Sequence, residues 1–215
     1  PERPPRPGPA PPPAPAPPPR PDLFRSDKMF VNVAVIGALS GPAIRRSGAR
    51  PGDGLWVTGR LGAPAAALES LYAGETPDAS ARARLARPTP RIAEAKWLRD
   101  RGDRGDRGVT SMIDISDGLM SDGGHLAAAS AVKLVIDYES VPVHAAVLQA
   151  DHSLLGGEEY ELLFTLSEGS SDLASDFADQ FGLELSSVGR VLEGSGVQLL
   201  RGGVEVQLNG GYIHF

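Results

Sequence analysis

The 215-residue sequence contains no cysteine, which excludes disulfide bonds, thiolate nucleophiles and cysteine metal sites. It also lacks any run of about 18 apolar residues, which a membrane-spanning helix would need. Acidic residues outnumber basic ones by 27 to 21, and the net charge of −6 argues against a general binder of nucleic acid or anionic membranes. We therefore expect neither a nucleic-acid nor a membrane partner, and a cytoplasmic location is compatible with these absences.

Several common catalytic motifs are also missing. The sequence has no Gly-x-x-x-x-Gly-Lys phosphate loop, no Gly-x-Gly-x-x-Gly fingerprint, no His-Glu-x-x-His metal motif and no Gly-x-Ser-x-Gly nucleophile elbow. None of the four histidines has the spacing of a metal ligand: His125, His144, His152 and His214. The carboxylates are therefore the groups to consider for chemistry.

Proline, by contrast, is abundant at one end of the chain. Thirteen of the first 22 residues are proline, interleaved with alanine and arginine. Because proline has no backbone N–H to donate, such a stretch builds neither helix nor sheet. We expect residues 1–27 to form a disordered tail; an incidental linker is the simplest interpretation, and docking in an aromatic-lined groove is the alternative.

After the tail, strand and helix patterns mix without strict alternation. The β-branched stretch MFVNVAVIGAL (29–39) predicts a buried strand. Further strands are expected at 55–62, 111–113, 131–140, 185–193, 197–203 and 204–208, and helices at 63–74, 92–102, 118–130, 144–150 and 171–182. This order favours an α+β fold, with a mixed or antiparallel sheet layered with helices, over a doubly wound parallel sheet.

The stretch MIDISDGLMSDGGHL (112–126) places Asp114 at the end of a predicted strand and Asp117 at the start of a predicted helix. Two interpretations stay open from the residues alone. Ser116 and Asp117 could cap the helix by accepting hydrogen bonds from its free backbone amides. Capping does not explain Asp114, because an unpaired charge in an apolar strand would destabilise the fold. A bound hard cation such as Mg²⁺ would offset that free-energy cost, so the second interpretation is a metal site.

Two other stretches carry weaker signals. GGEEYELL (156–163) sets Glu158 and Glu159 after a flexible glycine turn, at the mouth of an apolar strand. AIRRSGARPGDG (43–54) sets Arg45 and Arg46 before a Ser-Gly turn, and guanidinium groups offer paired donors to a phosphate. A plain surface turn needs no such pair of glutamates, although two exposed glutamates are common, and each signal is weak on its own.

Four stretches, taken together and in this order, resemble thiamine-monophosphate kinase, a family in the aminoimidazole ribonucleotide synthetase-like superfamily. They are RRSGARPGDGLWVTGRLG, MIDISDGL, GGEEYELLF and the terminal GYIHF. The resemblance runs from about residue 30 to residue 215. It implies ATP-dependent phosphorylation of thiamine monophosphate to thiamine diphosphate with Mg²⁺, and it suggests a homodimer. The fold it implies from residue 41 onward is the C-terminal α+β domain of that superfamily.

The resemblance also implies roles for particular residues. Asp114 and Asp117 would bind Mg²⁺, and Ser116 and Arg46 would contact ATP. Glu158 would contact thiamine monophosphate, and the ring of Tyr212 would stack on it. Phosphoryl transfer depends on positioning and charge neutralisation rather than on a covalent nucleophile, so the resemblance assigns no catalytic residue beyond these.

The sequence departs from the family before residue 30, where the N-terminal acidic metal and nucleotide motifs are missing. We therefore expect residues 28–40 to be the last strand of a truncated N-terminal domain, followed by a C-terminal domain at 41–215. Two hypotheses remain: a kinase in truncated form, or a non-catalytic domain that binds a ligand or pairs with another chain. The missing motifs, if found upstream in the same genomic locus, would distinguish them.

Overall fold

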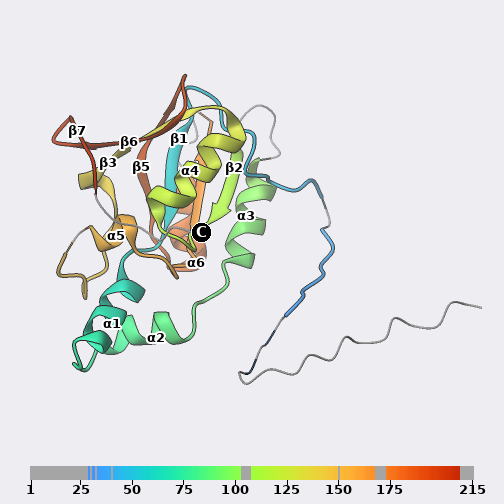
Figure 1. Cartoon of the computed structure of the whole chain (residues 1–215). Helices are drawn as coiled ribbons and strands as arrows, with labels where there is room; N and C mark the ends of the chain where they lie inside the picture. The colour runs from blue at the N-terminus through green and yellow to red at the C-terminus, as the bar shows by residue number, and fades with distance from the viewer. Residues whose placement is uncertain are drawn as a thin grey trace, which may run out of the picture. The chain divides into compact units, whose positions relative to one another are not determined.

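A computed structural model describes residues 29, 31, 33–39, 41–102, 108–149, 151–167 and 173–208 (Figure 1). The chain divides into two units, Pro1–Ser40 and Gly41–Phe215. Among the described residues, none of the helices has both the length and the apolar character needed to cross a bilayer.

The second unit is built on one seven-stranded sheet with the order β2-β4-β1-β5-β3-β6-β7. The strands are β1 (Gly54–Thr58), β2 (Val109–Asp114), β3 (Lys133–Asp137), β4 (Leu162–Leu166), β5 (Leu185–Leu192), β6 (Gly196–Arg201) and β7 (Val204–Val206). All neighbours are antiparallel except β3 and β6, which are parallel. The expected α+β class with a mixed sheet is thus confirmed.

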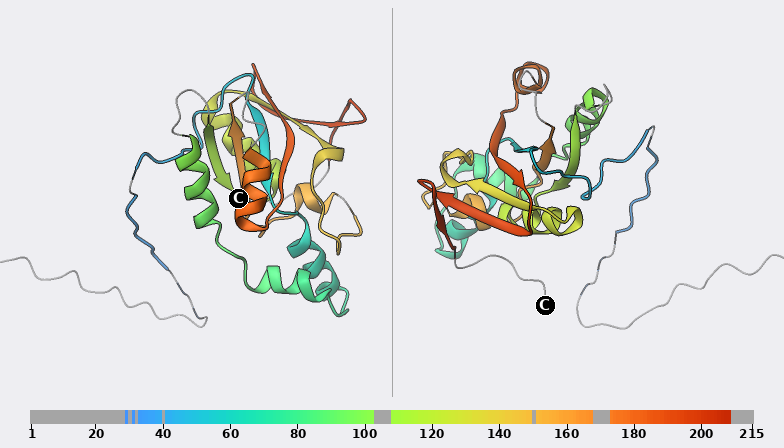
Figure 2. Two further views of the ribbon diagram at one scale, coloured as in Figure 1. Left: turned by 180° about the vertical axis from the view of Figure 1, so that it is seen from behind. Right: turned by 90° about the horizontal axis from the view of Figure 1, so that it is seen from above.

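Helices cover both faces of this sheet (Figure 2). They are α1 (Ala63–Tyr72), α2 (Ala79–Ala86), α3 (Ile92–Gly102), α4 (Leu119–Ser130), α5 (His152–Leu155) and α6 (Leu173–Phe181), with a 3₁₀ turn, η1, at Tyr138–Ser140. Leu119 and Leu126 of α4 pack with one face of the sheet, in the larger core. Leu98 of α3 and Phe177 of α6 pack with the other face, in a second core.

Strand β4 shows why the sheet needs helices on both sides. All five of its residues are buried. Because successive side chains of a strand point to opposite faces, Leu163 joins the core under α4 while Phe164 joins the core under α3 and α6. The polar member, Thr165, shares a hydrogen bond with Ser111 of β2, with 2.7 Å between the two hydroxyl oxygens. The LLFTL sequence therefore suits a central strand.

Helices α1 and α2 form a pair at one end of the sheet. Ala63 and Ala67 of α1 pack against Ala81 of α2 in a small core of their own. Alanine side chains allow the two helices to approach closely. This packing uses one side of α1 and leaves the side that carries Leu68 and Tyr72 exposed.

Two expected elements are wrong. The described residues between 29 and 39 adopt no strand, and their large apolar side chains are exposed. A strand requires a partner for its backbone groups, and none of the described strands pairs with this stretch. The helix expected at 144–150 is instead a turn through its described residues, because the backbone there binds Leu61: Leu61 N donates to Pro142 O, and His144 N donates to Leu61 O.

Candidate functional site

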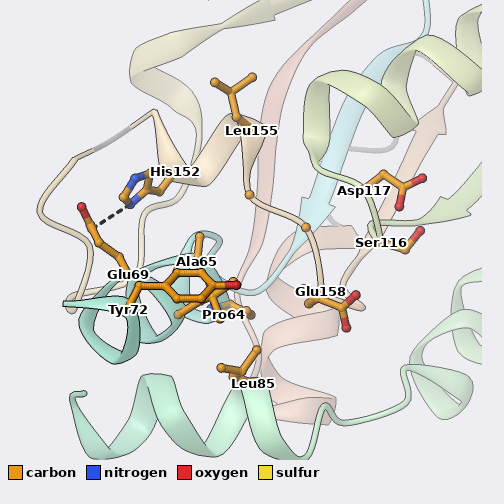
Figure 3. A pocket seen from close by; sticks show the side chains of 13 residues that line it. Pro64, Ala65, Glu69, Tyr72, Leu85, Ser116, Asp117, His152, Leu155 and Glu158 are labelled. Atoms are coloured by element: carbon orange, nitrogen blue, oxygen red, sulfur yellow. Dashed lines mark ion pairs between the residues drawn. The ribbon is translucent and has the colours of Figure 1, made fainter. Parts of the chain in front are cut away.

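A pocket of about 760 Å³ lies between α1, the turn at Ser116 and Asp117 in the MIDISDGL motif, and the start of the GGEEYELL motif at Gly156–Glu158 (Figure 3). Its apolar wall comes from α1, α2 and α5, and its polar wall from two loops. The lining residues are Pro64, Ala65, Leu68, Glu69, Tyr72, Leu85, Ser116, Asp117, His152, Leu155, Gly156, Gly157 and Glu158. Three residues expected from the sequence to bind ligands, Ser116, Asp117 and Glu158, therefore line one pocket.

The first polar loop joins β2 to α4 and carries Ser116 and Asp117. Asp122, in the first turn of α4, is 2% exposed, and its Oδ2 accepts hydrogen bonds of 2.9 Å from the backbone N–H groups of Ser116 and Asp117. Burial raises the pKa of Asp122 above its ordinary value, the two N–H donors oppose this, and the charges of Asp117 and Asp114 add to the rise. Asp122 therefore holds the backbone of Ser116 and Asp117 in place against the first turn of α4.

The N-cap of α4 is not one of the residues expected from the sequence. Gly118, with φ of 110°, is the N-cap and makes no side-chain capping bond. Ser116 and Asp117 precede it and line the pocket. The N-cap position is therefore held by Gly118 and not by Ser116 or Asp117. The sequence analysis missed the structural role of Asp122, although a carboxylate in the first turn of a helix was a signal for it.

The second polar loop, at 156–158, is held directly on the first. Glu158 N donates to Ser116 O, and Tyr160 N donates to Ile115 O, both at 2.8 Å. A Cβ at Gly157 would lie 2.4 Å from the Ser116 carbonyl oxygen, so only glycine permits this approach. The contact between two loops about 40 residues apart thus explains Gly157. A Cβ at Gly156 would instead lie 2.5 Å from the carbonyl oxygen of His152.

One face of α1 forms the largest part of the apolar wall. Pro64, Leu68 and Tyr72 are four residues apart, as are Ala65 and Glu69, so all five point to the same side of the helix. Opposite them, His152 of α5 forms an ion pair with Glu69, with 3.6 Å between Nδ1 and Oε2, when the imidazole is protonated. This pair ties α1 to α5 at the edge of the pocket.

Glu161 anchors α2, which contributes Leu85 to the pocket wall, and the start of α3. Its carboxylate is 1% exposed and accepts hydrogen bonds from Arg84 (2.7 Å), from Arg91 (2.7 and 2.9 Å) and from the Thr58 hydroxyl (2.6 Å). Arg84 belongs to α2, and Arg91 immediately precedes α3. The sequence analysis missed this network, because its partners are 70 or more residues apart.

Glu159 holds the start of α1. The side chain is buried, and its Oε1 accepts a hydrogen bond from the backbone N–H of Gly62, the N-cap of α1. Its Oε2 has no hydrogen-bond partner among the residues that the structure describes, although Arg84 lies 3.7 Å away. Burial raises the pKa of Glu159 to about 8, against the Gly62 hydrogen bond and the charge of Arg84. At neutral pH the neutral acid therefore predominates.

The remaining predicted residues lie apart from the pocket or outside the described residues. Asp114 is the last residue of β2 and is exposed, so the argument that it is a buried unpaired charge is wrong. The Arg46 carbonyl accepts a hydrogen bond from Ser130, the last residue of α4. Ser116 lies at the other end of this 12-residue helix, which is about 18 Å long, so Arg46 lies apart from the pocket. Tyr212 and the rest of the terminal motif lie outside the described residues.

A possible cation site adjoins the first polar loop. Ligand atoms of Asp117, Asp122 and His125 all lie within 4.8 Å of one another, and these three form the cluster found among the described residues. Carboxylate oxygens suit a hard cation such as Mg²⁺, which commonly keeps several waters and uses one or two carboxylates. Asp117 fits that chemistry, and Asp122 offers Oδ1, since its two backbone hydrogen bonds are both accepted by Oδ2.

The mixed sheet and the helices on both of its faces define an α+β domain, and the pocket lies against α1 of that domain. Residues 50–201 match the model of the family described as AIR synthase related protein, C-terminal domain. This match covers more than half of the chain, and the chain belongs to that family.

Individual relatives point in the same direction. The thiamine-monophosphate kinase of Methanopyrus kandleri is 32% identical over 189 residues, which is 84% of this chain and 57% of the relative. The solved thiamine-monophosphate kinase from Stenotrophomonas maltophilia K279a is 35% identical, with a TM-score of 0.67 over 74% of this chain and 53% of that one. A solved structure of AaThiL complexed with AMPPCP and TMP is 32% identical and has a TM-score of 0.62. The match covers 80% of this chain and 54% of that one. The chain thus spans little more than half the length of these relatives.

Proposed function

We propose that this chain provides the C-terminal part of a thiamine-monophosphate kinase. In that reaction a phosphate oxygen of thiamine monophosphate attacks the γ-phosphorus of ATP, the bond to the β–γ bridging oxygen breaks, and ADP leaves. The observation that carries the proposal is the meeting of Ser116, Asp117 and Glu158 in one pocket. The names of the relatives and the AMPPCP and TMP bound to AaThiL support the choice of substrates.

Within this proposal, the polar wall handles phosphate and the apolar wall receives the organic part of the substrate. Asp117 would hold Mg²⁺ together with Asp114, the last residue of β2, and Ser116 would contact ATP. Arg46 lies near the other end of α4 and would contact a more distant part of the nucleotide. Glu158 would contact thiamine monophosphate, together with Tyr212. When bound, Mg²⁺ neutralises charge on the transferring phosphoryl group. A homodimer and a cytoplasmic location complete the proposal.

A thermal melt tests the role of the carboxylates. Mg·ATP at ten times its dissociation constant should stabilise the parent chain by about 1.4 kcal/mol, because a ligand that binds only the folded state stabilises it. Asp117→Asn and Asp114→Asn should each abolish this gain, because each removes a ligand of the cation.

Asp179→Asn is the matched control, since Asp179 is an exposed acid on α6, which covers the other face of the sheet. It should respond to Mg·ATP as the parent does. A parent chain that is indifferent to Mg·ATP would contradict the nucleotide site and would favour a non-catalytic domain.

A further inference from the structure

The pocket has an aromatic residue for which the proposed roles do not account. Tyr72 is the last residue of α1, lines the pocket and is 84% exposed. Figure 3 shows its ring on the α1 side of the pocket, with the hydroxyl end directed toward the side where Glu158 lies. Its neighbour Leu71 is 47% exposed but does not line the pocket. Tyr72 therefore presents a ring to a ligand without having a packing role of its own.

The charges around the pocket select the ligand that such a ring would face. Among the described residues, the lining includes three carboxylates, on Glu69, Asp117 and Glu158, and no lysine or arginine. The face of an aromatic ring carries partial negative charge, so it attracts a cation placed over it. A pocket with this combination favours a flat, positively charged ring over a neutral ring of the same shape.

The two walls also fix the direction of such a ligand. Ser116, Asp117 and Glu158 form the polar wall, whereas Leu68, Leu85 and Leu155 contribute to the apolar one. A phosphate group has to lie on the polar wall, where a metal ion can offset the carboxylate charge. The organic ring then lies against α1, within reach of the helix end that carries Tyr72.

We propose that Tyr72 is a specificity-determining residue of this pocket, whose ring covers the cationic ring of the bound substrate. The inference rests on the proposed function, because it concerns the same pocket and its substrate. It adds a described residue to the stacking role that the sequence resemblance gave to Tyr212 alone.

Calorimetric titration tests this inference with two ligands in the presence of Mg²⁺: thiamine monophosphate, and an analogue in which a neutral thiophene replaces the cationic thiazolium ring. A cation over an aromatic face contributes about 0.5–2 kcal/mol, equivalent to about a 2- to 30-fold change in affinity. We expect Tyr72→Ala to weaken binding of the cationic ligand by that factor and binding of the neutral analogue by less. Tyr72→Phe should keep the parent preference.

Leu71→Ala is the matched control, because Leu71 adjoins Tyr72 on α1 outside the pocket lining, and it should leave both affinities unchanged. Since Tyr72 is exposed, its variants should melt at the parent temperature. Equal affinities of parent and Tyr72→Ala for thiamine monophosphate would overturn the inference and leave the proposed function intact, as would an equal loss for both ligands. A parent chain that binds neither ligand would overturn the proposed function and the inference with it.

Discussion

Glu161→Ala should lower the free energy of unfolding by about 3–5 kcal/mol, the cost of breaking a buried ion pair by removing one partner. The carboxylate of Glu161 is 1% exposed and serves two arginines, whose side chains are themselves only 25% exposed (Arg84) and 15% exposed (Arg91). Without Glu161, both guanidinium groups lose their main acceptor, and the Thr58 hydroxyl loses its carboxylate partner. Urea denaturation of parent and variant at pH 7 measures the difference.

Glu184→Ala is the control for this prediction. Glu184 pairs with Arg60 at 2.8 Å, but both side chains are about half exposed, and exposed pairs contribute only about 0–1 kcal/mol. If Glu161→Ala costs no more than Glu184→Ala, the buried network does not hold α2 and α3 on the sheet.

Glu159→Gln should remove a pH dependence from the stability of the chain. In the folded protein the pKa of Glu159 is raised to about 8 by burial, from an ordinary value of 4.5. Between these values the folded state binds one more proton than the unfolded state, so this group makes stability fall as pH rises. Below pH 4.5 this group contributes fully to the free energy of unfolding, and by pH 8 the contribution is lost. At 1.36 kcal/mol per pH unit, the loss amounts to about 5 kcal/mol.

The measurement is the free energy of unfolding of both proteins at pH 5 and at pH 8. Glutamine resembles the neutral acid, so Glu159→Gln should match the parent at pH 5 and exceed its stability at pH 8. Glu158→Gln, at the exposed neighbouring position, should follow the parent at both values. A Glu159→Gln variant that loses stability with pH as steeply as the parent would show that Glu159 is ionised throughout this range.

The sequence predicted the elements whose residues determine their own conformation. The β-branched stretch before Asp114 and the alanine- and leucine-rich stretch after Gly118 became β2 and α4, because local periodicity and burial agree there. The two stretches that failed, 29–39 and 144–150, depend on partners. The first has apolar residues but no neighbouring strand among those described, and the second follows its backbone hydrogen bonds to Leu61.

The site was predicted in part for the same reason. The motifs indicated Ser116, Asp117 and Glu158, and the structure brings these three residues to one pocket. The residues that position them were not predictable from local patterns. Asp122 acts through backbone N–H groups that precede its helix, and Glu161 through arginines 70 and 77 positions away. The exposure of Asp114 depended on where β2 ends relative to the rest of the sheet.

The central claim is that the Ser116–Asp117 turn and the loop with Glu158 act on one bound substrate. Titration of thiamine monophosphate into the chain with Mg²⁺ and a non-hydrolysable ATP analogue tests it most directly, in the parent, Asp117→Asn, Glu158→Gln, the double variant and the Asp179→Asn control. We expect each single substitution to weaken binding of thiamine monophosphate and the control to match the parent. The double variant should lose less binding free energy than the sum of the two single losses. Parent affinity in Glu158→Gln, or losses that add fully, would contradict a shared site.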